Sequence, residues 1–499
     1  MIQNLIAGFA NVFRPFTFLM MSFGTLVGVV IGALPGLSGS TGIILMLPLI
    51  YKLDSDVALV MLCGLFCGSM YGGSISAILL NTPGTPSATA TLLDGYPMNK
   101  KGNAGRALGI SAVSSFIGGL ISAICLALLA PQLAKVALSF TSPDFFALSI
   151  FGLSIMASTD KNVVKGLIAG FAGLLISTVG VDGVAGLDRF TFGNYKLMRG
   201  FQLLPVLIGV FALSEVFLIV QKGGEREGAQ RDQYVGRVFP KSDDLKALLG
   251  SAVIGGLIGV FIGIIPGTGG AISCFLAYQV AKKLSKHPDD FGSGIPEGIA
   301  APEASNNGTT GGALIPMLCL GVPGDTVTSV MLGALTLIGV KPGPQLFVNP
   351  DGVKIVYAIL AGMIVIQFVM LIVGLAMAKV SPFVLRVPQT VLMPIIAVLC
   401  VVGAYSNSNN LFDVLIAIIF GIVGFFMKKF HYPGAPLVLG IVLGPIAEEN
   451  LNRALIVSKN DWTTFLTHPI SCTFLVISII IIIYSIIKNI HDSRKEQAL

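Results

Sequence analysis

Long stretches of the chain are continuously apolar and carry no charged side chain. No Asp, Glu, Lys or Arg occurs in residues 15–51, 57–93, 107–134, 247–281, 355–378 and 462–487. A helix needs about 20 apolar residues to cross the hydrocarbon core of a bilayer. Several stretches are long enough for two crossings, or for one crossing and a re-entrant segment. We therefore predict roughly ten to twelve helical elements in the membrane.

Two of the predicted helices are interrupted by the same Pro-Gly pair. Segment 26–36 returns as segment 257–267, with seven of eleven positions identical, and both copies end in Pro-Gly. Proline removes a backbone donor and glycine admits backbone angles closed to other residues, so each helix must break. The freed N–H and C=O groups then need partners inside the membrane. A single kink of this kind commonly serves close helix packing, but duplicated broken helices are typical of ligand sites in secondary transporters.

A second pair of motifs extends the duplication. Asn81-Thr-Pro-Gly-Thr85 aligns with Gly321-Val-Pro-Gly-Asp325, which lies 240 residues later. Each motif follows an apolar run of about eight residues, which is too short to cross a bilayer. We therefore expect each run to be one arm of a re-entrant hairpin, with the motif at its tip.

The duplication predicts two transmembrane repeats, one linker between them and one C-terminal segment. The first repeat is 1–220, the cytoplasmic linker 221–246 and the second repeat 247–460, and a C-terminal transmembrane helix and tail follow at 461–499. This division rests on the matched motifs and on the polar composition of the linker.

Basic residues in matched loops fall on different sides of the predicted membrane. They cluster at 100–106 in the first repeat and at 282–286 in the second, and these two loops are not counterparts. The positive-inside rule places both loops in the cytoplasm, and their counterparts at 341–351 and 52–56 outside. The repeats are therefore predicted to be inverted.

These patterns together predict an all-α polytopic membrane protein with two inverted repeats, broken helices and re-entrant helical hairpins. Composition agrees, because 54% of the residues are hydrophobic and 11% are charged, against about 25% charged in ordinary soluble domains. The net charge of +6 is attributed to cytoplasmic basic loops and not to nucleic-acid binding. Residues 1–16 lack a basic n-region and a small-residue cleavage site, so we expect no cleaved signal.

The two Pro-Gly breaks and the two hairpin tips, together called the four tips, hold the candidate substrate-binding residues. Backbone N–H groups at the start of a half-helix favour a carboxylate, and freed carbonyl groups favour a cation such as Na⁺. No Lys or Arg lies within the tips, so an anionic substrate would be held by N–H groups, hydroxyl groups and a bound cation. The predicted substrate-binding residues are Gly36, Ser38, Gly39, Ser40, Asn81, Thr82, Gly84, Thr85, Gly267, Thr268, Gly269, Gly270, Gly321, Pro323 and Gly324.

The candidate ion-coupling residues lie at the last tip and in the segment before it. Asp325 has two interpretations that the sequence leaves open, cation or proton coupling and a helix N-cap. Residues 296–312 are unusually rich in side-chain oxygens for a segment entering a membrane. The predicted ion-coupling residues are Glu303, Asn306, Asn307, Thr309 and Asp325. We expect no organic cofactor and no bound metal other than Na⁺ as a coupling ion, with H⁺ as the alternative.

Other function classes find less support in the sequence. There is no phosphate-binding loop, no His-Glu-x-x-His and no Gly-x-Ser-x-Gly, and no cluster of nucleophile, base and metal ligands lies near one interface. We therefore expect no enzyme. An ion channel stays an alternative, because Gly-rich re-entrant loops also build selectivity filters.

Several motifs resemble those of a known family along nearly the whole chain. They are PGLSG at 35–39, NTPGTP at 81–86, DGYPM at 94–98, PEASNNG at 302–308 and GVPGD at 321–325. They resemble the large membrane subunit of tripartite tricarboxylate transporters. The resemblance implies a multi-pass permease of the bacterial inner membrane, driven by a Na⁺ or H⁺ gradient and taking up citrate-like tricarboxylates or other carboxylates. It also implies two partners, a periplasmic solute-binding protein and a small four-helix membrane subunit.

Overall fold

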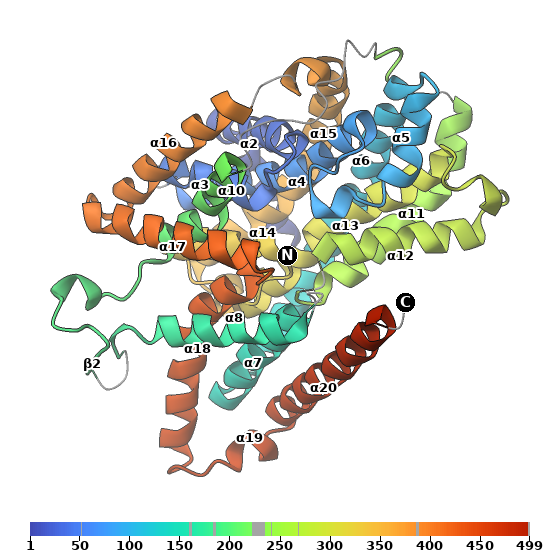
Figure 1. Ribbon diagram of the computed structural model, residues 1–499. Helices are drawn as coiled ribbons and strands as arrows, with labels where there is room; N and C mark the ends of the chain where they lie inside the picture. The colour runs from blue at the N-terminus through green and yellow to red at the C-terminus, as the bar shows by residue number, and fades with distance from the viewer. Residues whose placement is uncertain are drawn as a thin grey trace. The chain divides into compact units, whose positions relative to one another are not determined.

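The computed structural model describes most of the chain (Figure 1). The described residues are 1–50, 52–158, 162–182, 186–221, 235–240, 242–267, 269–385 and 389–497. Most of the predicted linker 221–246 lies outside this part, as does Thr268, one of the predicted substrate-binding residues.

The first half of the chain is almost entirely helical. Its elements are α1 (Ile2–Val12), α2 (Pro15–Ala33), α3 (Gly39–Ile50), α4 (Ser55–Leu80), the 3₁₀ turn η1 (Pro86–Ala88), α5 (Leu92–Lys100), α6 (Ala104–Ala137), α7 (Ser142–Ser158), α8 (Val163–Ser177), α9 (Leu203–Leu207), a π-helical segment (Ile208–Leu213) and α10 (Ser214–Gln221). Between α8 and α9, the strands β1 (Gly180–Val181) and β2 (Asp188–Arg189) pair antiparallel, with Gly180 opposite Arg189.

The second half repeats the helical pattern. Its helices are α11 (Ser242–Ile264), α12 (Gly269–Leu284), α13 (Pro296–Leu320), α14 (Thr326–Leu337), α15 (Pro350–Val384), α16 (Gln389–Ser408), α17 (Leu411–Lys429), α18 (Gly434–Val457), α19 (Thr464–Thr467) and α20 (Pro469–Gln497). In the described part of the chain, seven helices are long and apolar enough to cross a membrane, and six shorter helices are also apolar. The predicted all-α polytopic membrane fold is confirmed.

The chain packs as two compact units, and each unit takes helices from both halves. The first unit comprises Met1–Ala134 and Ile219–Ile395, and the second comprises Lys135–Leu218 and Ile396–Leu499. The boundaries between the units fall within α6, α10 and α16. The packing units are thus drawn differently from the predicted sequence repeats, and the repeat boundaries stay a prediction.

Glycines hold the first unit's paired helices close together. A methyl group built at Gly24, Gly28 or Gly32 of α2 would lie 2.2, 2.3 or 2.2 Å from a carbonyl oxygen of α4, at Met61, Leu65 and Ser69 respectively. The contacting residues follow each other in the same order along both helices, so α2 and α4 run parallel. The helix between them, α3, must therefore run back, which makes α2 and α3 a re-entrant pair.

The second half contains the same arrangement. Gly255, Gly259 and Gly263 of α11 face carbonyl oxygens of α13, at Ala301, Ser305 and Thr309. Helices α11, α12 and α13 pack against one another and lie side by side (Figure 1). The packing of α11 on α12 shows that the second Pro-Gly lies at the turn of a helical hairpin.

The short apolar arms expected before Asn81 and Gly321 are not separate elements. They are the last turns of α4 and α13, which have 26 and 25 residues. The glycines inside these helices do not break them. They allow close packing instead, because Gly72 faces the carbonyl oxygen of Val29 and Gly312 faces that of Val260. Each of the two helices continues without a break until its tip motif.

The second unit has its own core. Helix α18 packs against both α7 and α8, α20 packs against α7, and α17 packs against the π-helical segment. Leu153, Met156, Leu439 and Leu443 form a buried cluster between α7 and α18. Lys428 forms an ion pair with Glu215, which joins α17 to α10.

Candidate functional site

In each half of the first unit, the end of the helix that stops at Pro-Gly (α2 or α11) contacts the tip motif that follows the long helix (α4 or α13). The backbone N–H of Gly267 donates to the carbonyl oxygen of Gly324 at 2.8 Å. In the first half, a methyl group at Gly84 would lie 2.1 Å from the carbonyl oxygen of Gly32, and the N–H of Gly84 donates to Gly73 at 3.1 Å. The glycines at both tips are thus required for a close approach of backbone to backbone.

The two halves also contact each other reciprocally at two junctions. At the first junction, Gly39 at the start of α3 lies against Ser69 and Val327. At the second junction, Gly270 at the start of α12 lies against Ser87, Asn306 and Met70. Gly270 is the counterpart of Gly39, and Val327 is the counterpart of Ser87. Reciprocal contacts of this kind are those of an approximate two-fold relation between the halves.

The two junctions bring together corresponding elements, but several of the side chains at matched positions differ. At the offset of 240 residues that aligns α4 with α13, Asn306 replaces Phe66, Glu303 replaces Cys63 and Asn307 replaces Cys67. At the tips, the first half has Ser87 where the second half has Val327. At these positions the polar side chains are therefore on α13 and at Ser87, although the first junction also contains the Ser69 hydroxyl, 2.4 Å from a methyl group built at Gly39.

Asn306 is fully buried, and only one of its two side-chain amide atoms has a hydrogen-bond partner. Its Nδ2 donates to the carbonyl oxygen of Met70 at 2.9 Å, whereas its Oδ1 has no hydrogen-bond partner. This oxygen lies on the side of Gly270, 3.3 Å from a methyl group built there. An unpaired acceptor in an apolar interior costs about 1–3 kcal/mol, which a bound ligand can offset.

Glu303 lies one turn earlier on α13 and is fully buried. Thr91 at the start of α5 donates to its Oε1, and Ser111 and Ser115 of α6 donate to its Oε2 at 3.0 and 3.1 Å. None of the ion pairs formed by the described residues includes Glu303. Hydroxyl groups from two neighbouring helices therefore stabilise this carboxylate without a basic side chain.

The remaining predicted coupling residues have different surroundings. Both amide atoms of buried Asn307 lack a partner. Thr309 donates to the carbonyl oxygen of Asn306 at 2.6 Å, a local bond within α13. Asp325 caps α14: its Oδ1 accepts from the backbone N–H of Thr328 at 2.7 Å, and the Thr328 hydroxyl accepts from the N–H of Asp325 at 2.8 Å. The N-cap interpretation thus describes the geometry at Asp325.

The predicted substrate residues divide into buried and exposed groups. Gly39, Ser40, Gly84, Thr85, Gly267, Gly270, Gly321, Pro323 and Gly324 are buried, Ser38 and Gly269 are half-buried, and Gly36, Asn81 and Thr82 are exposed. Asn81 ends α4 with a φ of 57°, and Gly321 ends α13 with a φ of 71°. The left-handed conformation at both helix ends explains why Asn and Gly occupy these positions.

Some residues at the site are absent from the predicted set. Ser87 belongs to a tip motif, but nothing in its sequence position indicates the contact with Gly270. Thr91, Ser111 and Ser115 come from other helices than Glu303. The spacing of Ser111 and Ser115 places both on one face of a helix that has no charged residue between 107 and 134. This spacing was the only sequence signal for the pair.

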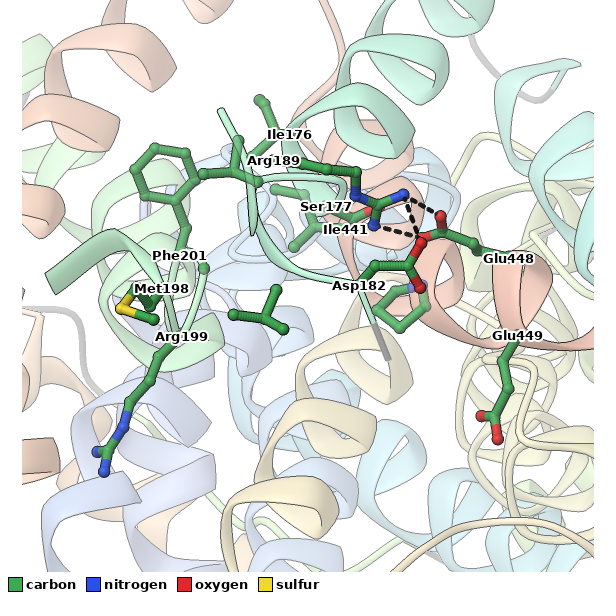
Figure 2. A pocket seen from close by; sticks show the side chains of 14 residues that line it. Ile176, Ser177, Asp182, Arg189, Met198, Arg199, Phe201, Ile441, Glu448 and Glu449 are labelled. Carbon is green, nitrogen blue, oxygen red and sulfur yellow. Dashed lines mark hydrogen bonds and ion pairs between the residues drawn. The ribbon is translucent and has the colours of Figure 1, made fainter. Parts of the chain in front are cut away.

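A separate cavity of about 420 Å³ lies in the second unit, beside the two strands. Figure 2 shows that Arg189, one of the residues that line it, forms ion pairs with Glu448 and Asp182, while Arg199 points away from this cluster. The hydrogen bonds to Glu448 raise the pKa of Arg189 above its usual value. None of the predicted site residues lines this cavity, and its charges are largely paired with each other.

Comparison with known proteins points to one family. The model of the tripartite tricarboxylate transporter TctA family matches residues 18–439. A protein of Agrobacterium vitis described as "Uncharacterized 52.8 kDa protein in TAR-I ttuC' 3'region" is 36% identical over 496 residues, covering 99% of this chain and 98% of that protein. A second, "Uncharacterized protein in TAR-II ttuC' 3'region" from the same organism, is 36% identical over 238 residues, covering 48% of this chain and 98% of that protein. No solved structure matches the chain.

Proposed function

The chain belongs to the tripartite tricarboxylate transporter TctA family, and from this premise we propose that it is the large permease subunit of a transporter that takes up carboxylates. The proposed substrates are citrate-like tricarboxylates or related carboxylates. A dicarboxylate or an aromatic carboxylate carried by the same mechanism is the alternative. Uptake is secondary active transport, in which a Na⁺ or H⁺ gradient supplies the free energy.

The second junction is the observation that carries this proposal. A buried, unpaired Asn306 oxygen lies beside the first turn of α12, and neither that turn nor α13 contains Lys or Arg. The first N–H groups of a helix have no intrahelical partner and favour an anion. This combination suits a carboxylate bound together with a cation better than it suits either one alone.

The proposed substrate site consists of the four tips, framed by the buried glycines and by Ser40 and Thr85. The proposed coupling residues are Glu303, Asn306, Asn307, Thr309 and Asp325. Asn81 and Thr82 are exposed, and their role as ligands rests on the sequence motif. Alternating access would expose this site to either side in turn, with the hairpins in a moving core.

The proposed partners are a periplasmic solute-binding protein, which delivers the carboxylate, and a small four-helix membrane subunit. The proposed location is the bacterial inner membrane. Both proposals rest on family membership, which the match over residues 18–439 establishes.

The test is uptake into proteoliposomes that contain the chain and its membrane partner, with the binding protein added outside. A panel of labelled carboxylates is offered while the Na⁺ and pH gradients are varied independently. We expect saturable accumulation of one carboxylate class that requires the binding protein and one gradient. An ion channel would instead conduct without concentrating any solute, and an ion current without carboxylate accumulation would contradict the proposal.

A further inference from the structure

We propose that a cavity at the predicted outer end of the first unit binds the headgroup of an anionic phospholipid, of the kind that phosphatidylglycerol represents. The cavity has a volume of about 300 Å³, and its wall includes Asn11 of α1, Arg14 of the turn before α2, and Lys354 near the start of α15. None of the described substrate or coupling residues lines it. The inference goes beyond the proposed function and does not depend on it.

The side chains at this cavity leave one positive charge unbalanced. Lys354 forms an ion pair with Asp56 at 3.2 Å, and Nδ2 of Asn11 donates to the same carboxylate oxygen at 2.6 Å. Arg14 is exposed, no acidic residue lines the cavity, and no ion pair among the described residues includes its guanidinium. A ligand with a single negative charge would therefore neutralise the cavity.

Asn11 adds a requirement for a hydrogen-bond donor. It is 5% exposed, and its Oδ1 has no hydrogen-bond partner, although its Nδ2 is bonded to Asp56. A buried acceptor without a donor costs free energy, and a hydroxyl group of a ligand in the cavity would remove that cost. An inorganic anion such as chloride has no such group. The wall thus suits a ligand that combines an anionic group with hydroxyl groups.

The cavity lies at the ends of two helices that can cross the membrane. Both α2 and α15 are long and apolar enough to do so, and Arg14 directly precedes α2, while Lys354 is the fifth residue of α15. Long basic side chains at the ends of membrane-spanning helices place their charges in the headgroup region. The positive charge of the cavity is therefore at the depth of lipid phosphate groups.

The amphipathic helix α1 indicates a lipid rather than a soluble anion. Its 11 residues extend about 16 Å, which is too short to cross a bilayer. Positions 4, 7, 8 and 11 line the cavity, whereas Ile2, Ile6 and the following Phe13 lie on the opposite face and are 76, 62 and 60% exposed. A helix of this kind lies in the interface with its apolar face among the acyl chains. A lipid can use both the polar cavity and the apolar surface beside it.

The charge of the cavity selects among phospholipid headgroups. The phosphodiester of phosphatidylglycerol has one negative charge, which equals the unbalanced charge of Arg14, and a guanidinium binds phosphate oxygens in a bidentate manner. The glycerol headgroup is neutral and supplies hydroxyl donors. Phosphatidylethanolamine and phosphatidylcholine have a cationic group next to the phosphate, which Arg14 and Lys354 would repel. An anionic lipid with a hydroxylated headgroup therefore fits this cavity best.

The test measures lipid binding to the purified full-length chain. The chain is stripped of lipid in a neutral detergent, and its Tm is recorded as dioleoyl phosphatidylglycerol, phosphatidylethanolamine or phosphatidylcholine is added. We expect phosphatidylglycerol to raise the Tm at a mole fraction at least fivefold lower than either zwitterionic lipid. Arg14→Gln should remove this preference. Lys341→Gln also removes an exposed positive charge on the same predicted side, but outside the cavity, so it should respond as the wild type does.

Soluble glycerol phosphate distinguishes a lipid from a free anion, because it has the phosphate and the hydroxyl groups without the acyl chains. It should give no shift at concentrations at which phosphatidylglycerol saturates, and an equal shift would overturn the lipid as the occupant. Equal responses of the wild type to phosphatidylglycerol and phosphatidylcholine would overturn the site. So would equal phosphatidylglycerol responses of the wild type and Arg14→Gln, with circular dichroism showing that the variant is folded.

A second measurement quantifies the phosphatidylglycerol that copurifies with the chain from cells. Arg14→Gln should retain less of this lipid than Lys341→Gln does, because only Arg14 lines the cavity. Equal amounts in the two variants would also overturn the assignment.

Discussion

Glu303 shows at the scale of one residue how a carboxylate is kept inside an apolar helix bundle. Three hydroxyl groups on α5 and α6 donate to it, and no basic side chain is needed. An ionisable residue in such a position is most often functional in a membrane protein. Its charge also orders its neighbours, because hydroxyl groups that donate to a carboxylate would reorganise when that charge is neutralised.

Replacing Glu303 with Gln should separate coupling from folding. Gln keeps an oxygen acceptor for part of the hydroxyl cluster but cannot change its charge. We expect gradient-driven accumulation to fall more than tenfold, with a loss of stability of about 1–3 kcal/mol for the unmet hydrogen bonds. Accumulation in proteoliposomes and Tm in detergent check the two effects.

Thr310→Val is the matched control on the same helix. The Thr310 hydroxyl donates to the carbonyl oxygen of Asn307 in its own helix, so its loss should leave accumulation within about twofold and stability within about 1 kcal/mol. Unchanged accumulation in Glu303→Gln, or an equal loss in both variants, would remove Glu303 from the coupling set.

Asn81 tests whether a tip residue acts through its backbone or its side chain. Its φ of 57° is the conformation that Gly321 adopts at the matching helix end. Asn81→Gly should therefore keep the Tm, whereas Asn81→Val should cost about 1–2 kcal/mol because a β-branched residue is strained there. If Asn81→Gly abolishes uptake in a folded protein, the amide side chain is a ligand.

At the scale of elements, the first unit depends on two parallel helix pairs held together by glycine. Gly259 is one contact of the α11 and α13 pair, and a methyl group there would lie 2.3 Å from the carbonyl oxygen of Ser305. Small residues permit this approach in membrane proteins. The tips reach each other only because these helices pack so closely.

Gly259→Ala should therefore force α11 away from α13. Overpacking of this kind costs about 1–3 kcal/mol, so we expect a lower Tm and reduced uptake. Gly250→Ala, on the same helix, is the control: no atom lies within 4 Å of a methyl group there, and alanine favours a helix by up to about 1 kcal/mol. Equal Tm values for the two variants would contradict the close-packing role.

At the scale of the whole molecule, the charge pattern and the folded contacts agree on which loops share a side. Lys101 donates to the carbonyl oxygen of Ser293 at 2.8 Å, and both belong to loops predicted to be cytoplasmic. Lys354 forms an ion pair with Asp56 at 3.2 Å, which joins the ends of segments predicted to be outside. The inverted orientation in the membrane stays a prediction.

Labelling of single cysteines tests that orientation. In a cysteine-free background, an impermeant maleimide added to intact cells should label Lys52→Cys and Lys341→Cys. It should label Lys101→Cys and Lys282→Cys only after the membrane is opened. Labelling of both first-half positions from the same side would exclude the predicted topology, and retained uptake of each variant shows that the protein is correctly inserted.

How much of the site was predictable differs from residue to residue. The Pro-Gly breaks were predictable from the sequence. Proline removes a backbone donor and glycine admits angles closed to other residues, whatever side chains surround them. Asp325 was ambiguous because a capping carboxylate and a ligand occupy the same sequence position. The partners of Glu303 were not predictable, since Thr91 and Ser111 approach it from helices about 190 to 210 residues away, as the contacts show.

The sequence alone determined the membrane class, the duplication, the breaks and the family, because these depend on hydrophobicity and on local backbone chemistry. Only the tertiary structure decided that compact units take helices from both halves, that Asn306 and Ser87 meet at Gly270, and that one oxygen of Asn306 is left unpaired. Those features depend on which side chains meet across a two-fold contact. The two copies of a duplicated motif look alike in sequence until their different neighbours are known.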